Sequence, residues 1–434
     1  MSESVVSAPQ IVYHQAVFSH PNYKFNQVLP NTYGQTISLG TSQNSVQMTI
    51  PAEVFNLAQS YLSFQVVLKG VAGNYIWTKE DTWSAIGHIQ HYAQNNQLIA
   101  DIDNLQNYMY IVGKKETALE DFLTFGSRQR LYRSNSVNNV VPALRYSGTP
   151  GTPAPSSLHY TEPAYWAVGA LSADVTINFM LPLQDIKNSI FSVDKNLYYA
   201  QPSFLKLYFG PLSKVAYMST SNADPNLGTP TALTSNCTVQ NLQLFLAVES
   251  NTMMRQHIMD KVNSSGLELF IPWVQSYKTT NSGTTQNVSL NFDIGNGQTL
   301  QKVIHSVFNN NETLNTAYDC SNNPTGPTAQ KVLTYRTLLN NKPLQDIVID
   351  CSLASNIFTD YLLMKRQLRG SVIQNRDMYQ HLWHHSDDFS SYGAEYDQHN
   401  NNELLSGVPM AGIPMTWTFN GATMVAGTYQ HYDF

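Results

Sequence analysis

The feature that most constrains the fold is a succession of short apolar runs that alternate with polar residues and end at turn residues. The segment 239–248 places Leu242, Leu244 and Leu246 on one face, and 288–294 alternates strictly. Two-residue alternation is typical of strands with one buried face. Comparable runs occupy 61–68, 84–92, 97–102, 175–181, 204–209, 267–271, 301–308, 347–349 and 415–419. Strands this short and frequent predict β-sandwiches or barrels rather than a parallel sheet.

The composition narrows the class of protein further. Charged residues make up 12% of the 434 residues, against about 25% in an ordinary soluble domain. Hydrophobic residues reach 42%, so the chain can bury a large core and is not intrinsically disordered. The net charge of -6 excludes a globally basic surface for nucleic acid. Such sparse charge suits a surface that copies of the same chain or other partners cover.

Turn signals and loops divide the chain into two β-domains of similar size. Asn95 and Asn96 predict a hairpin turn between two strands, and short helices are expected at 116–123 and 358–368. Long loops are expected at 146–163, 219–236 and 321–330. The predicted divisions are an N-terminal arm at 1–45, a first domain at 46–218, a linker at 219–236, a second domain at 237–420 and a C-terminal tail at 421–434.

The compartment is predicted from what the sequence lacks. No apolar run approaches the roughly 18 residues that span a bilayer, and the first 15 residues resemble no secretion signal. Cys237, Cys320 and Cys351 have no metal-ligand spacing and cannot all pair. We therefore expect free, mostly buried thiols in a chain made in a reducing compartment and not secreted.

The order of several segments resembles the double jelly-roll major capsid proteins of tailless icosahedral double-stranded DNA viruses. This is the lineage of polinton-like viruses, virophages and adenovirus hexon. Residues 49–64 (TIPAEVFNLAQSYLSF) resemble the opening of the first roll, and 86–110 the hairpin that follows. Residues 179–183 (FMLPL) and 204–208 (FLKLY) resemble its closing strands. The resemblance covers roughly 46–420, and the second roll is identified mainly from its strand rhythm and the helix at 358–368.

The resemblance implies a fold and a function. The fold would be all-β, with two tandem eight-stranded jelly-roll sandwiches, long loops and a few short helices. The function would be that of a non-enzymatic homotrimeric capsomer that tiles the shell of a virion. Its partners would be neighbouring capsomers and minor or penton proteins, with indirect contact to packaged DNA or an internal membrane, and no cofactor. The alternative is a β-sandwich carbohydrate-binding or host-attachment protein, because jelly rolls serve both purposes.

One string of residues suggests a metal site. His381, His384 and His385 would share a face of a helix, with Asp387 and Asp388 close by. Imidazole is a favoured zinc ligand, but no HExxH motif is present and a polar cluster on a loop accounts for the same residues. We therefore predict no metal site and keep the three histidines as weak candidates. His88 and His91 are three apart in a strand, hence on opposite faces, and are not expected to chelate together.

Two basic clusters are the remaining candidates. Arg128, Arg130 and Arg133 lie in the first half, and Lys365, Arg366 and Arg369 in the second. They would contact DNA phosphates on an inner surface or, as the commoner explanation, form solvated or intersubunit ion pairs. Asp101 and Asp103 share a strand face, as a carboxylate pair in a glycosidase would. No nucleophile elbow, P-loop or dinucleotide-binding motif accompanies them, so we predict no enzymatic role.

Overall fold

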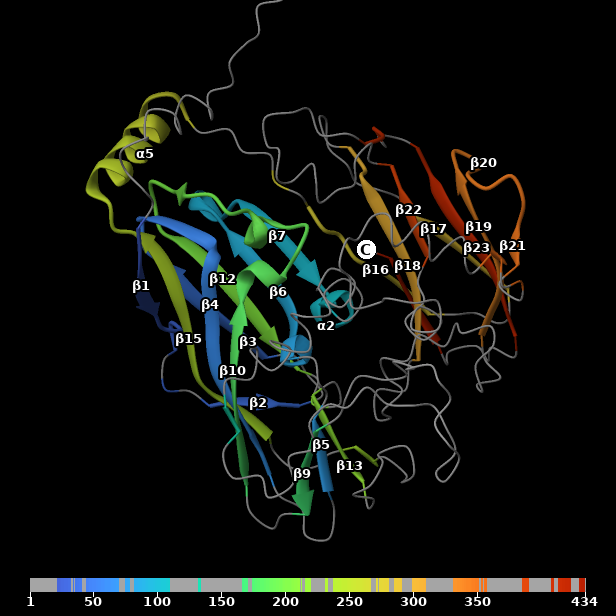
Figure 1. Ribbon diagram of the computed structural model, residues 1–434, viewed down its shortest axis with the longest axis horizontal. Helices are drawn as coiled ribbons and strands as arrows, with labels where there is room; N and C mark the ends of the chain where they lie inside the picture. Colours follow the sequence, from blue (N-terminus) through green and yellow to red (C-terminus); the bar gives the residue numbers. More distant parts are fainter. Residues whose placement is uncertain are drawn as a thin grey trace, which may run out of the picture.

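Two β-sandwiches lie side by side along the longest axis of the molecule (Figure 1). They are seen in a computed structural model of the chain. The structure describes residues 22–32, 34, 36–40, 44–69, 75–78, 82–109, 132–133, 166–170, 174–210, 212, 215–219, 231–232, 237–266, 271, 273–280, 285–290, 299–309, 331–350, 353, 355–356, 385–389, 407–409, 413–422 and 429–433.

The larger sheet of the first sandwich has seven antiparallel strands in the order β1-β15-β4-β10-β8, with β2 beside β15 and β11 beside β4. Their bounds are β1 Tyr23–Val28, β2 Ile37–Leu39, β4 Val54–Leu68, β8 Tyr132–Arg133, β10 Val175–Pro182, β11 Leu197–Tyr198 and β15 Cys237–Glu249. β4 and β15 are long, and they carry most of the pairing. From Tyr61 to Leu68, every second residue of β4 is buried. This alternation directs Leu62 and Phe64 into the core and Tyr61 to the outer face.

The facing sheet has four strands in the order β3-β12-β6-β7. Their bounds are β3 Asn44–Ile50, β6 Ile86–Tyr92, β7 Leu98–Asp103 and β12 Ser203–Phe209. β6 and β7 form the predicted hairpin, and the turn η2 (Gln94–Asn96) holds Asn95 and Asn96 at φ 60° and 58°. Asparagine tolerates this left-handed conformation better than most residues. The hairpin prediction is therefore confirmed.

The core of the first sandwich forms where the two sheets meet. Phe64 of β4 stacks on Phe179 of β10 at a ring-centroid distance of 5.3 Å, and its edge meets Phe209 of β12 at 5.9 Å. Such aromatic pairs stabilise a core beyond the area they bury. Short 3₁₀ segments and a third, four-stranded sheet in the order β14-β13-β5-β9 also lie in the described part of this half of the chain. Besides η2, these elements are β5 Tyr75–Thr78, β9 Trp166–Ala170, β13 Ala216–Ser219, β14 Thr231–Ala232, η1 Thr82–Ala85, η4 Leu183–Asp185 and η5 Ile190–Ser192.

The second sandwich is built from β16 onward, coloured from dark yellow through orange to red in Figure 1. One sheet has the order β16-β24-β18-β22, and the other has β17-β23-β19-β20 with β21 beside β19. The bounds are β16 Tyr277–Thr280, β17 Thr285–Leu290, β18 Lys302–Asn309, β19 Lys331–Leu339, β20 Lys342–Pro343, β21 Ile349–Asp350, β22 His385–Asp388, β23 Met415–Ala422 and β24 Tyr429–Asp433. Among the described residues of this sandwich, Trp417 and Tyr335 are the largest fully buried side chains.

Two α-helices lie wholly in the described part of the chain, α2 (Leu105–Tyr108) and α5 (Thr252–Ser265), and residues 355–356 are also helical. The helix α5 was not predicted from the sequence. Its N-cap is Asn251, whose side-chain oxygen accepts from the amides of Met253 and Met254. Only Met254 and Ile258 of α5 are buried, so its apolar face is narrow. The helices predicted at 116–123 and 358–368 lie outside the described residues. Among those residues, no helix combines the length and the apolar character that crossing a bilayer requires.

Glu249, at the end of β15, explains how α5 and the N-terminal strand are joined. Its buried carboxylate accepts from the backbone amides of Asn22 and Asn251, both at 2.9 Å, and from the Asn196 side chain at 3.2 Å. Hydrogen bonds to an ionised group are the strong kind. The carboxylate therefore joins the start of β1, the cap of α5 and the loop before β11 at one point.

Strand pairing departs from the predicted divisions in three places. β1 and β2 belong to the first sandwich, although 1–45 was predicted to be an arm. β15 pairs with β4, although the second domain was predicted to begin at 237. β24 pairs with β16 and β18, although 421–434 was predicted to be a tail. These strands take partners far away in sequence, which local alternation does not reveal. The remaining divisions stay predictions, and the predicted loops at 146–163 and 321–330 lie outside the described residues.

Candidate functional site

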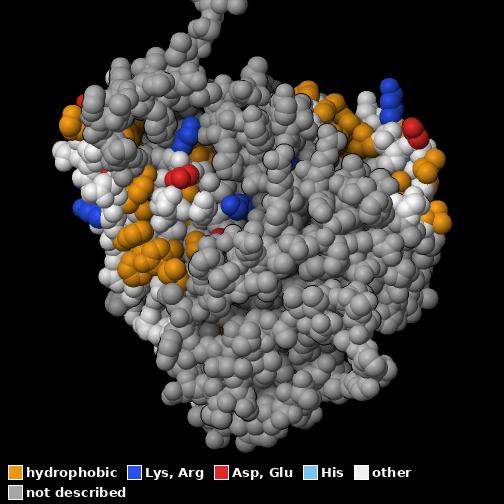
Figure 2. All heavy atoms as spheres, in the orientation of Figure 1, with side chains coloured by type: hydrophobic (Ala, Val, Ile, Leu, Met, Phe, Trp, Pro, Cys, Tyr) orange, Lys and Arg blue, Asp and Glu red, His pale blue; other side chains and the backbone are white. Residues whose placement is uncertain are grey.

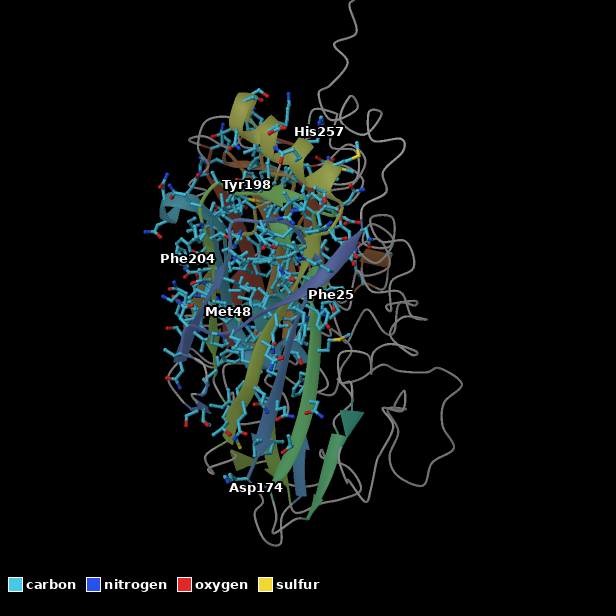
Figure 3. All side chains as sticks on the ribbon, turned by 90° about the vertical axis from the view of Figure 1, so that its left-hand side faces the viewer. Phe25, Met48, Asp174, Tyr198, Phe204 and His257 are labelled. Atoms are coloured by element: carbon cyan, nitrogen blue, oxygen red, sulfur yellow. The ribbon has the colours of Figure 1, made fainter. Side chains whose placement is uncertain are left out.

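Three aromatic side chains form a continuous row on the outer face of the seven-stranded sheet. Tyr61 of β4 stacks on Phe245 of β15 at a centroid distance of 4.9 Å, and Phe25 of β1 meets Tyr61 at 5.5 Å. The row follows from register, because Phe245 lies opposite Tyr61 across the strand pair. Phe25 is 53% exposed, and Figure 3 labels it on the flank that faces the viewer. We call Phe25, Tyr61 and Phe245 the aromatic row.

A second apolar surface lies at the other end of the molecule. Between β20 and β21, Leu344, Ile347 and Val348 are 40%, 65% and 50% exposed. We call residues 344–348 the aliphatic loop. Figure 1 places β20 and β21 at the opposite end of the long axis from β1, and Figure 2 shows hydrophobic side chains on both sides of the molecule. Large exposed apolar side chains grouped in this way mark interaction surfaces more often than isolated ones do.

Hydrogen bonds hold the aliphatic loop in place. Gln345 turns toward the sandwich, where its carbonyl oxygen accepts from the Thr337 amide at 2.8 Å and its nitrogen donates to Asp387 at 3.3 Å. The Leu344 amide donates to the Thr337 carbonyl at 2.9 Å. Because Gln345 is anchored, the residues on either side of it remain exposed on a fixed backbone.

His385, one of the weak metal candidates, belongs to a buried cluster between β18 and β22. Nε2 of His385 lies 3.1 Å from Oδ1 of Asp387, and Nε2 of His305 lies 3.3 Å from Oδ2. The His305 ring stacks on Trp417 at 4.8 Å. Burial alone would raise the pKa of the Asp387 carboxyl, but the His385 and His305 imidazoles hold it well below its usual value.

This buried cluster has a structural role, because it links two paired strands. One carboxylate faces an imidazole from each of two paired strands, which fixes β22 against β18. Among the described residues, no group of three His, Cys, Asp or Glu is arranged to hold a metal ion. His381 and His384 lie outside the described residues.

His88 and His91 occupy opposite faces of β6, as predicted from their spacing. His88 is partly exposed, pairs with Asp101 and stacks on Tyr208 at 4.7 Å. His91 is fully buried, and its Nε2 lies 3.3 Å from the Tyr199 hydroxyl. The hydrogen bond from His88 is the main reason that the pKa of Asp101 lies below its usual value. Asp101 is therefore held as an ionised partner of His88, which is not the state of a general acid.

The other predicted site residues are placed only in part. Arg133 lies in β8 opposite Ile177, whereas Arg128, Arg130, Lys365, Arg366 and Arg369 lie outside the described residues. Their contacts remain predictions. Cys237 is a buried free thiol whose pKa is raised by burial, which agrees with the prediction for that residue.

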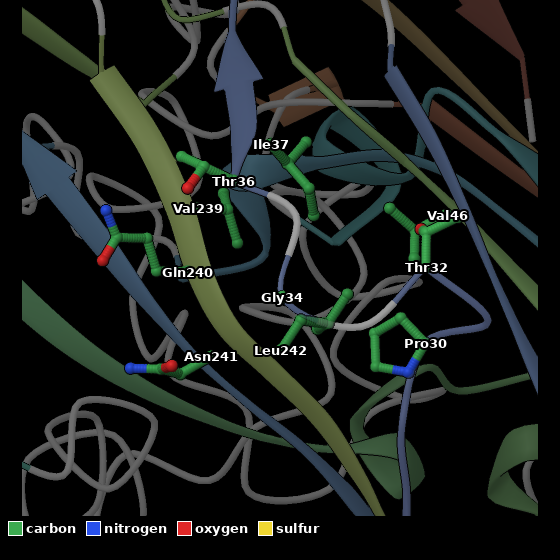
Figure 4. A pocket seen from close by; sticks show the side chains of 10 residues that line it. All are labelled: Pro30, Thr32, Gly34, Thr36, Ile37, Val46, Val239, Gln240, Asn241 and Leu242. Atoms are coloured by element: carbon green, nitrogen blue, oxygen red, sulfur yellow. The ribbon is translucent and has the colours of Figure 1, made fainter.

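A pocket of about 190 Å³ opens beside β15, next to the turn between β1 and β2 (Figure 4). It is lined by Pro30, Thr32, Gly34, Thr36, Ile37, Val46, Val239, Gln240, Asn241 and Leu242. Asn241 has a φ of 53° and lies in a β-bulge between Gln240 and Gln243. None of the lining residues is charged, and Thr32, Thr36, Gln240 and Asn241 are polar, so the pocket suits a neutral, hydrogen-bonding group better than an ionic ligand.

Sequence reasoning missed both exposed surfaces. Phe25 falls in a stretch without sustained alternation, which was predicted to be an arm. Residues 347–349 were predicted to be a strand, but only Ile349 lies in β21, while Ile347 and Val348 are exposed in the loop. The sequence signal that could have indicated the exposed loop is the apolar pair Ile347 and Val348, directly after Asp346.

Comparisons with known proteins find likeness in structure and none in sequence. A chain in the cryo-electron microscopy structure of the Sputnik virophage matches 96% of this chain and 86% of its own length, with a TM-score of 0.50 and 10% identity. The crystal structure of the mavirus major capsid protein matches 100% of this chain and 92% of its own length, with a TM-score of 0.45 and 10% identity. No family model and no curated protein sequence matches the chain.

The chain has a double jelly-roll fold. The predicted fold class, all-β with two tandem sandwiches and few helices, is confirmed. Among the described residues, β1, β2 and β11 add to the larger sheet of the first sandwich, and β21 adds a short strand beside β19 in the second. At 10% identity, the likeness to the Sputnik chain concerns the fold alone.

Proposed function

We propose that this chain is the major capsid protein of an icosahedral double-stranded DNA virus, and that its homotrimer is the capsomer that tiles the shell. The observation that carries the proposal is the tandem arrangement of two sandwiches in one chain, which the Sputnik virophage chain shares over nearly its whole length. The role is mechanical and barrier-forming, without catalysis. The protein then resides in the virion and is assembled inside the host cell.

The tandem sandwiches suit a tile for a geometric reason. Three copies of a two-sandwich chain give a ring of six sandwiches, so three-fold symmetry produces a six-fold outline that packs into a flat array. Each sandwich buries its sheets face to face and leaves few long free edges for uncontrolled pairing. A ring of identical copies needs two different, complementary flanks on each copy.

The surface chemistry supports self-association. Only 12% of the residues are charged, and burying an unpaired charge in an interface costs several kcal/mol. Exposed apolar side chains lie at both ends of the long axis, on β1 and between β20 and β21. Amide and hydroxyl side chains, which replace charge in this chain, can be satisfied across an interface by bridging water.

The partners follow from the same proposal. They are sister chains, neighbouring capsomers and minor or penton proteins, with packaged DNA or an internal membrane beneath the shell. The loops at 146–163 and 321–330 would form the outer face, and the segment before β1 would contact neighbouring tiles. The two basic clusters, at 128–133 and 365–369, would serve as intersubunit or inner-surface contacts.

The test is the mass of the purified protein in solution. Size-exclusion chromatography with light scattering should give a particle near three times the chain mass of 48.6 kDa, and negative-stain images should show hexagonal particles. A stable monomer at high concentration would contradict the proposal. Glycan-array binding by such a monomer would favour the alternative, a carbohydrate-binding or host-attachment protein.

A further inference from the structure

The aromatic row and the aliphatic loop differ in chemistry and lie at opposite ends of the molecule. A two-fold contact places the same patch of both copies against itself, so it would cover one of these surfaces and leave the other exposed. A head-to-tail contact covers both at once, since each copy offers one surface to each neighbour. The positions of the two surfaces therefore favour a second copy of this chain as the occupant of both.

We propose that the aliphatic loop of one copy docks on the aromatic row of the next copy, and that this contact, repeated around the ring, closes the homotrimer. The inference rests on the proposed function and assigns its subunit interface to named side chains. Ile347 and Val348 would lie against the rings of Phe25 and Tyr61. Branched aliphatic groups and flat rings pack closely, and aromatic residues are enriched at the centres of protein interfaces.

Charge at the edge of each surface is complementary. Lys24 precedes Phe25 on β1, and Asp346 precedes Ile347 in the aliphatic loop; both charged residues are exposed. Lys24 leaves the edge strand β1 on the face opposite Phe25, so it would meet Asp346 by reaching round the edge of the sheet. Rim charges of this kind contribute to the encounter rate and to the choice of partner more than to affinity.

The aliphatic loop needs little ordering before it docks. Gln345 and Leu344 tie it to Thr337 of β19 by hydrogen bonds of 2.8 and 2.9 Å. The aromatic row is held in register by the pairing of β15 with β4. Both surfaces are therefore preformed, which lowers the entropic cost of association.

The first experiment measures trimer dissociation for Phe25→Asp and Ile347→Asp by light scattering on dilution. Each variant should raise the concentration at which half of the trimer dissociates by about tenfold or more. Thr279→Asp is the matched control, because Thr279 is exposed on β16, which Figure 1 places between the two ends of the long axis. If neither Phe25→Asp nor Ile347→Asp changes the concentration at which the trimer dissociates, the inference is overturned. Far-ultraviolet circular dichroism checks that each variant is folded.

The second experiment places cysteines at both surfaces of one chain. Phe25→Cys with Ile347→Cys, in a background of Cys320→Ser and Cys351→Ser, is treated with a short bismaleimide. Denaturing gels should show linked dimers and trimers for the double variant and none for either single variant. Dimers from Phe25→Cys alone would indicate a two-fold contact and overturn the inference.

The two proposals fail in different ways. If the wild-type protein is trimeric but the double-cysteine variant does not cross-link and the aspartate variants remain trimeric, the interface assignment is wrong and the capsomer proposal stands. If the wild-type protein is monomeric, the capsomer proposal fails and the interface fails with it.

Discussion

Lowering the pH from 7 to 5 should weaken the first sandwich through His91, an imidazole enclosed by the core on β6. His91 has no exposed surface, and its ring lies 5.8 Å from the Tyr199 ring and 6.2 Å from the Phe191 ring between centroids. Burial disfavours the charged imidazolium and lowers the pKa of His91 from its usual 6.5 to about 4. Folding therefore requires the neutral ring.

The sign of the pH dependence follows from that lowered pKa. Between pH 6.5 and 4 the unfolded chain binds a proton at His91 and the folded chain does not, so acid favours unfolding. At pH 5 nearly every unfolded chain carries the proton, against about a tenth of the folded chains, which costs about 2 kcal/mol of stability. The full difference, about 3 kcal/mol, is reached below pH 4.

Hydrogen–deuterium exchange with mass spectrometry can follow the peptides of β6 and β12 at each pH, after correction for the intrinsic exchange rate. Their opening free energy should fall by about 2 kcal/mol between pH 7 and 5 in the wild type. In His91→Gln, which lacks the titrating ring, this fall should largely disappear, although the variant is less stable at pH 7. An equal fall in both proteins would refute the assignment to His91.

Three further outcomes are expected. Glu249→Gln should cost about 2 kcal/mol in urea unfolding, since three donors face that carboxylate, whereas the exposed Asp260→Asn should change little. Asp387→Asn should cost about 3 kcal/mol at pH 7, because it removes the carboxylate that His305 and His385 both face; exchange in β18 and β22 would report it. Burial raises the pKa of Tyr199 to about 12. The stability that its neutral hydroxyl contributes is therefore complete below pH 10 and is lost as the pH rises toward 12. Tyr199→Phe should remove that alkaline loss from the unfolding profile.

The parts of the fold that the sequence predicted are those with strong local signals. β4, β10, β12 and β15 alternate over most of their length, and the β6–β7 hairpin carries two adjacent asparagines that accept a left-handed backbone. Alternation identifies a strand because one buried face repeats every second residue. It carries no information on which strand is the neighbour, so the sheet order could not be predicted from it.

The missed elements have weak local signals. α5 buries only Met254 and Ile258, so the sequence shows almost no helical period, although Asn251 and Gly266 bracket it as cap residues. β1 buries only Val28 of its six residues. Its position is fixed by β15, more than two hundred residues later, and by the contacts of Glu249. The aromatic row exists only after this pairing, which is why no sequence motif indicates it.

The central place of β15 has a consequence for how the chain divides. β15 lies between β1 and β4 in the larger sheet, and its Leu244 and Leu246 are fully buried in the core. A fragment that ends at residue 218 would expose the edge of β4 and the apolar face that β15 covers, so we expect it to aggregate. A fragment of residues 22–266 retains β15, Glu249 and α5 and should be soluble and cooperative in thermal unfolding. If both fragments were equally soluble and folded, β15 would be dispensable for the first sandwich, and the division at 236 would be the better one.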